Sequence, residues 1–541
     1  MSSLVIAQVE QVQSLVARGF SFIKANSTEG DRVSAARLDQ QQNAIFELAV
    51  AHAQLMTASG YLAYARERAE RDQALANLFA AEMCAEVIGR LNRAAPDYGL
   101  SSTDLAVDGD FWPALHKVLS RDAVVDLGAA IADDASLGDR GLGEEHAMMA
   151  DTFRQFGEAV VAPRAEEIHR QDQLIPDEIL HGLRDLGCFG LSVPERFGGL
   201  LPDDGEDSIG MIVVTEELSR ASLGAAGSLI TRPEIMARAL LEGGTEAQQA
   251  KWLPKIAAGE PLCGIALTEP DYGSDVASMK LKATQVEGGW LLSGSKTWST
   301  FAGKAGVLLT IARTNPDLSL GHRGLSLFMC EKPSFDGESF EFTQPGGGSL
   351  SGTAIATVGY RGMHSYQLFY DDFFVPDENV VGESQGLGKG FYFTMRGLMG
   401  GRIQTAARAC GVMQAAFDHG LRYARERKVF GQPIADFELT QSKLARMAAH
   451  LAAARQMTYA VGRLMDEGKG QTEASLVKLF ACKSAEWVAR EAMQIHGGMG
   501  YAEETAVSRY WQDARVLSIF EGTEETLALK VVGRNLVENA D

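Results

Sequence analysis

The sequence predicts a multidomain α+β protein in which helical segments flank one central block of strands. Apolar residues recur at three- and four-residue spacing up to about Gly259 and again from Gly388 onward, as they do in amphipathic helices. From Pro261 to about Pro376 the period changes to two, and β-branched and aromatic residues increase. The helical and strand patterns do not alternate, and no Gly-x-Gly-x-x-Gly follows a strand, so a doubly wound dinucleotide fold is not expected.

Length and charge narrow the class of protein. A chain of 541 residues with 46% hydrophobic residues exceeds one ordinary core and predicts roughly three or four domains. The net charge of −21 argues against nucleic acid or an anionic membrane as a partner. Six widely spaced cysteines without a Cys-x-x-Cys pair predict reduced thiols and no metal site. Because neither a signal-peptide pattern nor a membrane-spanning apolar stretch is found, we expect a cytoplasmic protein.

The predicted elements fall into four segments along the chain. They are an extra Ala-rich helical domain over 1–139, a helical domain over 145–259, a central β domain over 260–378 and a C-terminal helical domain over 385–541. The clearest strands of the β domain are predicted at Trp290–Gly294, Val307–Ala312 and Leu325–Met329. The first segment carries no catalytic constellation, so a role in packing or assembly is expected for it.

Glu521 is the leading candidate for a catalytic residue. It ends the apolar run Leu517–Phe520 and is followed at once by Gly522 and Thr523. A carboxylate between bulky apolar neighbours is partly desolvated, which suits a general base, and the glycine lets a flat ligand approach the backbone. The same tripeptide is also an ordinary helix start, with Thr523 as the cap. Motifs elsewhere in the chain distinguish between a general base and a plain helix start at this position.

Two blocks in the β region are suited to a flat ligand that carries phosphate. In the first, Leu267 and Thr268 end an extended segment, and Gly273 and Ser274 follow a proline turn, which offers hydroxyl and backbone N–H groups. A bare turn would look similar.

The second block runs from Lys296 to Phe301. It places Trp298 two residues from Thr300, so that an aromatic ring could flank a flat ligand while the hydroxyl bonds its edge. A tryptophan of the core is the ordinary alternative.

Two further blocks lie in the C-terminal helical region. Arg427 stands close to Phe430, a combination suited to a pyrophosphate and a stacked base, although surface charge at a helix end is the plain alternative. Gln494 and Gly498 belong to Met493–Tyr501, where glycines stop a helix and leave backbone exposed.

In this order and at this spacing, the four blocks and Glu521 resemble the acyl-CoA dehydrogenase family over about residues 145–541. The resemblance implies FAD as the cofactor, Glu521 as the base, and a site shared between subunits of a homodimer. It also implies that Thr523 and Glu525 lie near the adenosine part, with Glu525 standing where the family usually has Gln. The residues that would contact FAD by this resemblance are Leu267, Thr268, Gly273, Ser274, Trp298, Thr300, Arg427, Phe430, Gln494 and Gly498.

Some members of the family carry the base elsewhere, immediately before an arginine near the thioester. The matching stretch here is Gly400-Gly401-Arg402, and because a glycine cannot be a base, Glu521 is left as the candidate and Arg402 as the substrate-side arginine. Such a base would take the α-proton of an acyl-CoA while the β-hydrogen leaves as hydride to the flavin.

Arg220 and Arg232 are candidates for the far end of the acyl pocket, where members acting on dicarboxylates need a cation. For Arg220 an ion pair with Glu216 or Glu217 is an equal alternative. We expect a short, branched dicarboxylic acyl-CoA as substrate and an electron-transferring flavoprotein as acceptor.

Three alternatives remain open at the level of the sequence. They are a short-chain monocarboxylic acyl-CoA dehydrogenase, an acyl-CoA oxidase that passes electrons to oxygen, and a nucleic-acid-associated alkylation-response flavoprotein. Binding to a DNA duplex needs clustered cations, and after Glu521 the chain has only Lys530 and Arg534.

Residues 1–139 would occupy surface that other members of the acyl-CoA dehydrogenase family use to form tetramers.

Overall fold

The computed structural model describes residues 5–107 and 109–541, which fall into two compact units. Unit 1 combines residues 1–147 with residues 405–541, and unit 2 spans residues 148–404. Helical segments precede and follow one eight-stranded sheet, and two short hairpins, β1–β2 (Thr28–Glu29 and Arg32–Val33) and β11–β12 (Lys428–Val429 and Gln432–Pro433), lie among the helices. The predicted α+β class is therefore confirmed. Helix α14 (Gly390–Glu426) contains the division between the units, which falls after Gln404.

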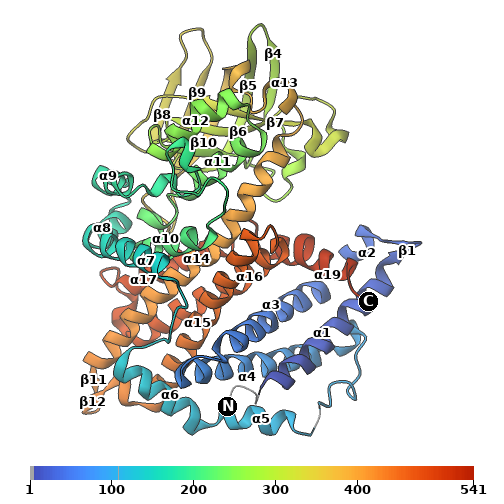
Figure 1. Ribbon diagram of the computed structural model, residues 1–541, viewed down its shortest axis with the longest axis vertical. Helices are drawn as coiled ribbons and strands as arrows, with labels where there is room; N and C mark the ends of the chain where they lie inside the picture. Colours follow the sequence, from blue (N-terminus) through green and yellow to red (C-terminus); the bar gives the residue numbers. More distant parts are fainter. Residues whose placement is uncertain (1–4, 108) are drawn as a thin grey trace. The chain divides into compact units, whose positions relative to one another are not determined.

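Unit 1 joins the first helices of the chain to the last ones. Helix α15 packs against α4 and α6, and α16 packs against α3 (Figure 1). Gly128 on α6 lies so close to α15 that an added Cβ would come within 2.0 Å of the Gln441 carbonyl oxygen. The main helices are α1 (Ile6–Ser27), α3 (Gln42–Ala65), α4 (Glu70–Arg93), α5 (Phe111–Leu119), α6 (Arg121–Asp134), α15 (Glu438–Asp466), α16 (Gln471–Ile495) and α17 (Ala506–Leu517).

Ion pairs on the rim of unit 1 also connect the two parts of the chain. Arg446 on α15 contacts Glu82 on α4 at 2.5 Å, and Lys530 contacts Asp39 at 2.6 Å. The early helices therefore pack both on one another, as α3 does on α1 and α4, and on the C-terminal helices α15 and α16.

Unit 2 contains an eight-stranded sheet with the order β3-β6-β4-β5-β10-β9-β8, and β7 pairs with β6. The three predicted strands are found as β5, β6 and β7. β3 runs parallel to β6, whereas β5 lies antiparallel between β4 and β10. The strands are β3 (Cys263–Ala266), β4 (Lys282–Val286), β5 (Gly289–Thr300), β6 (Val307–Arg313), β7 (Leu325–Glu331), β8 (Ser339–Thr343), β9 (Ser349–Ile355) and β10 (Ser365–Pro376).

The helices of unit 2 pack in two groups. The first group shares a core with Phe301 and Met363, and the second, α11 and α12, packs against strands β3, β6 and β7 (Figure 1). The helical elements are α8 (Ala162–Gln171), α9 (Asp177–Asp185), α10 (Ser208–Ala221), the π-helical turn η5 (Leu223–Gly227), α11 (Thr231–Gly243) and α12 (Glu246–Ala258).

All six cysteines are buried and none forms a disulfide. Burial raises the pKa of Cys84, Cys263 and Cys330 to about 12. Within residues 5–107 and 109–541, no helix has the length and apolar character needed to cross a bilayer.

Candidate functional site

The first two predicted blocks meet in unit 2. The backbone N–H of Thr297 donates to the carbonyl of Thr268 at 2.8 Å, and the ammonium of Lys296 donates to the carbonyl of Leu267 at 2.8 Å. The segment that follows β3 is therefore fixed against the end of β5. Residues 267–268 and 296–300 form one site rather than two separate motifs.

A buried ion pair that we did not single out in the sequence holds this junction. Glu269 accepts hydrogen bonds from the backbone N–H groups of Lys280 and Leu281 at 2.7 and 2.8 Å, and from Lys296 Nζ at 2.9 Å. Burial lowers the pKa of Lys296 to about 8 even with a carboxylate beside it. The only sign of this ion pair in the sequence is that the first block contains an acid, Glu269, and the second block contains a base, Lys296.

Trp298 leaves an indole open beside this junction. Its side chain is 56% exposed and its φ of 55° interrupts the regular strand, whereas Thr300 is buried and lies 2.9 Å from the Ser365 hydroxyl. Trp298 and Thr300 thus lie in different surroundings, unlike the common face that an extended strand would give them. Gly273, whose nearest side chain is that of Thr268, and Ser274 are both exposed. An open indole on the other side of the Thr268–Thr297 junction fits a flat ring with a phosphate tail, as FAD has.

The segments that carry the third and fourth predicted blocks lie close together in unit 1. The ring of Tyr423, near the end of α14 and four residues before Arg427, stacks on His496 at the end of α16 with centroids 4.2 Å apart. Arg427 and Gln494 are both exposed. A Cβ added at Gly498 would meet nothing within 4 Å, so the backbone there is open to a ligand.

Phe430 is the most exposed large apolar side chain of this region. It is 97% exposed at the tip of the hairpin formed by β11 (Lys428–Val429) and β12 (Gln432–Pro433), with a φ of 50°. An aromatic ring held out on a hairpin is not explained by packing in its own chain, and is typical of a contact with another molecule.

Glu521 sits in a strained loop after α17. Its φ is 56° and that of Gly522 is 96°, and the loop is held by a hydrogen bond of 2.6 Å from Lys478 Nζ to the Gly522 carbonyl. The guanidinium of Arg408 lies 5.4 Å from the ring centre of Phe520. The Glu521 side chain is partly exposed and has no hydrogen bond or ion pair with the described residues. A non-glycine residue in this region of φ costs about 1–3 kcal/mol and is often found at functional sites.

The residues after Gly522 also begin a short helix, α18 (Glu524–Thr526). The Thr523 side chain accepts from the Thr526 N–H at 3.3 Å, and Glu524 pairs with Lys483 at 2.8 Å. Glu525 is exposed. The loop therefore combines an ordinary helix cap with an unusual backbone at Glu521.

Arg220 and Arg232 have different surroundings. Arg220 lies 3.8 Å from carboxylate oxygens of both Glu158 and Glu217. Arg232 is only 8% exposed, and its guanidinium donates to the Ser228 carbonyl at 2.6 Å and to the Tyr360 hydroxyl at 3.5 Å. Within the part of the chain that the structure describes, no carboxylate lies within 4.0 Å of Arg232.

Helix α11, which follows Arg232, packs on the part of α14 that carries Arg402. Thr231 donates to the Gln404 side chain at 2.8 Å, and a Cβ at Gly400 would come within 2.5 Å of the Glu234 carboxylate. Arg402 itself is partly buried. The two arginines thus belong to packed neighbouring helical segments of unit 2.

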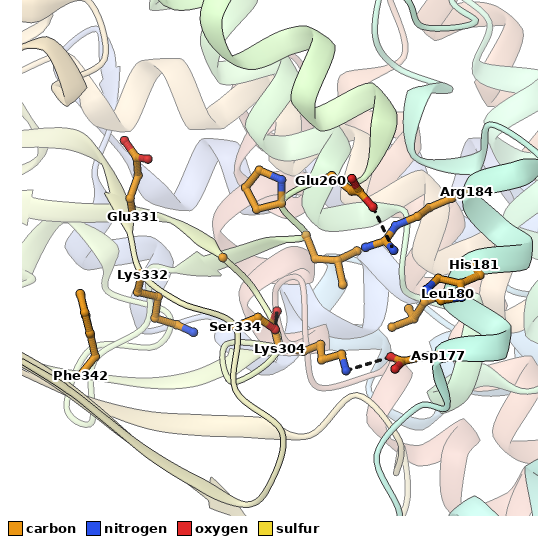
Figure 2. Close-up of a pocket in the computed structure, with 13 residues that line it drawn as sticks. Asp177, Leu180, His181, Arg184, Glu260, Lys304, Glu331, Lys332, Ser334 and Phe342 are labelled. Carbon is orange, nitrogen blue, oxygen red and sulfur yellow. Dashed lines mark hydrogen bonds and ion pairs between the residues drawn. The ribbon is translucent and has the colours of Figure 1, made fainter.

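A separate cavity of about 690 Å³ lies beside α9 and the end of β7 (Figure 2). Its charged groups already have partners: Arg184 faces Glu260 at 3.5 Å, Lys304 faces Asp177 at 2.9 Å, and Lys332 donates to three backbone carbonyls. None of the predicted site residues lines it, and its paired charges indicate a structural role.

Comparison with known proteins agrees with these blocks. Three family models match consecutive parts of the chain: the acyl-CoA dehydrogenase N-terminal domain over residues 143–260, the middle domain over 264–373 and the C-terminal domain over 388–537. A (2S)-methylsuccinyl-CoA dehydrogenase of Cereibacter sphaeroides is 44% identical over 406 residues, which is 75% of this chain and 72% of that protein.

Two solved structures have the same fold. The glutaryl-coenzyme A dehydrogenase in complex with glutaryl-CoA gives a TM-score of 0.66 at 31% identity, covering 74% of this chain and 98% of that one. A structure described as the electron transferring flavoprotein of Acidaminococcus fermentans gives a TM-score of 0.66 at 30% identity. The match covers 73% of this chain and 98% of that one. With all three family domains present in order, the chain belongs to the FAD-dependent acyl-CoA dehydrogenases.

Proposed function

We propose that this enzyme introduces the α,β double bond of a short, branched dicarboxylic acyl-CoA, converting methylsuccinyl-CoA to mesaconyl-CoA, and passes the electrons to an electron-transferring flavoprotein. The observation that carries the proposal is Arg232, a buried guanidinium with neutral hydrogen-bond partners. The relative at 44% identity supports the same substrate, because it is a (2S)-methylsuccinyl-CoA dehydrogenase.

The charge of Arg232 is the physical reason for a dicarboxylate. An arginine side chain stays protonated, so burial among neutral groups leaves a positive charge that lacks compensation. A carboxylate at the far end of the acyl group would supply it through charge-assisted hydrogen bonds. Arg220 does not need such a ligand, because two carboxylates already lie near it.

Glu521 is the proposed base that takes the α-proton. Its carboxylate forms no hydrogen bond or ion pair with the described residues. The hydrogen bond from Lys478 to the Gly522 carbonyl holds the loop in which Glu521 has its left-handed backbone, and so positions the Glu521 side chain. FAD, when bound, accepts the β-hydrogen as a hydride. Leu267, Thr268, Trp298 and Thr300 are the residues that would hold the ring, and Gly273 and Ser274 would hold the phosphates.

The exposed groups of unit 1 support a homodimer with a shared cofactor site. Arg427, Phe430, Gln494 and Gly498 are all open, and a hairpin carrying an almost completely exposed Phe is suited to reach a second copy of the chain. A cytoplasmic location suits the six buried thiols, because disulfides are rare in that compartment.

The choice of electron acceptor rests on family likeness and on one neighbour in particular. That neighbour is described as an electron transferring flavoprotein, and it matches this fold over 73% of the chain. Comparing dye reduction with peroxide formation under air tests the acceptor. Rapid stoichiometric hydrogen peroxide would instead assign the enzyme to the oxidases.

The substrate is tested with an anaerobic panel of CoA thioesters read at the flavin absorbance band. We expect (2S)- or (2R)-methylsuccinyl-CoA to bleach the flavin far faster than butyryl-CoA or isobutyryl-CoA. Arg232→Met should reduce this difference in bleaching rate, mainly by slowing the reaction of the dicarboxylic thioester. Without the guanidinium, the distal carboxylate of that substrate would be buried without a partner.

Arg220→Met is the matched control, because it removes an arginine of the same helical region that already has acidic partners. It should leave the ratio between dicarboxylate and monocarboxylate rates unchanged. A wild-type preference for butyryl-CoA or longer straight chains would contradict the proposed substrate.

A further inference from the structure

A buried histidine with a strained backbone stands immediately before β10. His364 is 6% exposed and has a φ of 47°, and the next residue, Ser365, is the first of the strand. A non-glycine residue keeps such a φ only where its surroundings fix it, and residues of this kind cluster at functional sites. The contacts of His364 therefore show what holds the strain and what depends on it.

The imidazole of His364 meets the end of helix α8. Its Nε2 lies 3.1 Å from Oδ1 of Asp172, within ion-pair distance, and its Nδ1 lies 3.3 Å from the carbonyl oxygen of Gly362. Among the residues that the structure describes, neither Nε2 nor this Oδ1 forms an aligned hydrogen bond with another group. Asp172 ends α8 with a φ of 52°. Two strained residues of different elements thus face each other through their side chains.

Backbone contacts hold the loop before β10 on the same end of α8. The Ile175 N–H donates to the Gly362 carbonyl at 3.2 Å, and the Arg361 guanidinium donates to the His169 carbonyl at 2.8 Å. Arg361 Nε also lies 3.6 Å from Oδ1 of Asp172. The loop is therefore docked on α8, and the Asp172 carboxylate lies between a guanidinium and an imidazole of that loop.

The backbone of His364 in turn fixes the end of β5. Its carbonyl accepts from the Phe301 N–H at 2.7 Å, and Phe301 is also left-handed, with a φ of 68°. Ser365 lies opposite Thr300 in the register of the two strands, and their hydroxyl oxygens are 2.9 Å apart. Both residues are buried. A displaced His364 would therefore move the group that orients the Thr300 hydroxyl.

We propose that His364 and Asp172 are positioning residues that keep the Thr300 hydroxyl directed at the flavin ring. The proposal rests on the proposed function, in which Thr300 helps to hold that ring. The contacts lead from the carboxylate of Asp172 to the imidazole of His364, and along the backbone to Ser365. A hydroxyl accepts as well as donates, so Thr300 can accept from Ser365 and still donate to the edge of the ring.

His364→Asn tests the histidine, because asparagine tolerates a left-handed backbone but its shorter side chain gives up the contact with Asp172. In the FAD-loaded enzyme, the rate of FAD release on dilution should rise about tenfold, the effect of one lost hydrogen bond. Flavin fluorescence follows the release. The visible absorption band of the flavin that stays bound should shift, because the polar group at the ring edge has moved. Thr300→Val, which removes the hydroxyl itself, should cause the same two changes.

Asp172→Gly removes the other half of the contact without straining the end of α8. Glycine is the preferred residue where a helix ends in a left-handed conformation, so the helix should keep its stability. The melting temperature should therefore stay near that of the wild type, while FAD release rises and the flavin band shifts as in His364→Asn. A purely structural role of Asp172 would leave both flavin measurements unchanged.

Ser365→Ala shows whether the effect passes through Thr300. In the Ser365→Ala background, His364→Asn should cause no further rise in FAD release, because the contact with Thr300 is already lost. The matched control is Gln248→Ala, beyond the far end of β10, where the Gln248 amide donates to the carbonyls of Glu378 and Val380. It should lower the melting temperature without shifting the flavin band.

The possible failures can be told apart. If Thr300→Val changes neither FAD release nor the flavin band, the proposed role of Thr300 is wrong, and the positioning role is wrong with it. If Thr300→Val changes both but His364→Asn and Asp172→Gly change neither, only the positioning role is wrong. An equal effect of His364→Asn with and without Ser365→Ala would overturn that role too, as would a band shift of the same size in Gln248→Ala.

Discussion

Replacing Glu269 by Gln should damage both the stability of unit 2 and its hold on FAD. The substitution removes the only carboxylate within 4.0 Å of Lys296 in the described chain, and Lys296 is completely buried. It also replaces one carboxylate oxygen by an amide NH₂, although each oxygen now accepts from a backbone N–H group, Oε2 from Lys280 and Oε1 from Leu281. The amide can rotate to satisfy one of these groups but not all three donors.

The size of the effect follows from burial. Glu269 and Lys296 are 5% and 0% exposed, and burial already lowers the pKa of the lysine to about 8 with the carboxylate present. Removing one partner of such a pair costs about 3–5 kcal/mol, because the other charge stays buried alone. At about 2–4 °C per kcal/mol for a unit of this size, the melting temperature should fall by roughly 6–20 °C.

The assay is thermal unfolding followed by circular dichroism, together with release of FAD followed by flavin fluorescence. FAD should dissociate more readily, because Lys296 also bonds the carbonyl of Leu267. Lys296→Met combined with Glu269→Gln removes both charges, so the double variant should lose about 2 kcal/mol less than the sum of the single variants. A Glu269→Gln protein that melts within about 2 °C of the wild type and retains its FAD would refute this reasoning, as would strict additivity.

Three further predictions concern separate parts of the chain. Glu521→Gln should keep yellow, FAD-bound protein but lose turnover by several orders of magnitude, and flavin reduction at a near-normal rate would place the base elsewhere. Phe430→Ser should shift the protein toward monomer in light scattering and weaken FAD retention, whereas an unchanged dimer would contradict the role of the hairpin. Burial lowers the pKa of His450 to about 4, so the folded state binds a proton less readily than the unfolded one, and stability should fall by about 1–2 kcal/mol between pH 7 and pH 5. His450→Leu should flatten that decline in a pH series of thermal melts.

The strands and the motif blocks could be predicted because their signals are local. Alternation and turn residues mark β5, β6 and β7, and the blocks are short runs. The junction between Thr268 and Thr297 depends instead on pairing across the sheet, in which β3 is parallel to β6 and β5 is antiparallel to β4 and β10. That order is set by long-range contacts. Neither block on its own therefore indicates that Glu269 pairs with Lys296.

The arginines show the same limit. The sequence already offered Arg220 a local ion pair with Glu216 or Glu217, and Glu217 does lie 3.8 Å from it. The second acid near Arg220 and the neutral surroundings of Arg232 depend on distant positions. Glu158, one partner of Arg220, is 62 residues away in sequence. The packing of α3 and α4 on α15 and α16 was similarly hidden, because Ala-rich faces match many possible partners equally well.

Glu525 is the one site position where the residue type opposes the predicted ligand, and its surroundings reduce that conflict. A carboxylate near a diphosphate costs least where water screens it, and Glu525 is exposed. The neighbouring acid, Glu524, is already paired with Lys483, and Lys478 on the same helix is bound to the Gly522 carbonyl. Two lysines of α16 therefore lie against the loop that carries Glu521 and Thr523. They offset the local negative charge where a protein with a net charge of −21 would otherwise repel an anionic cofactor.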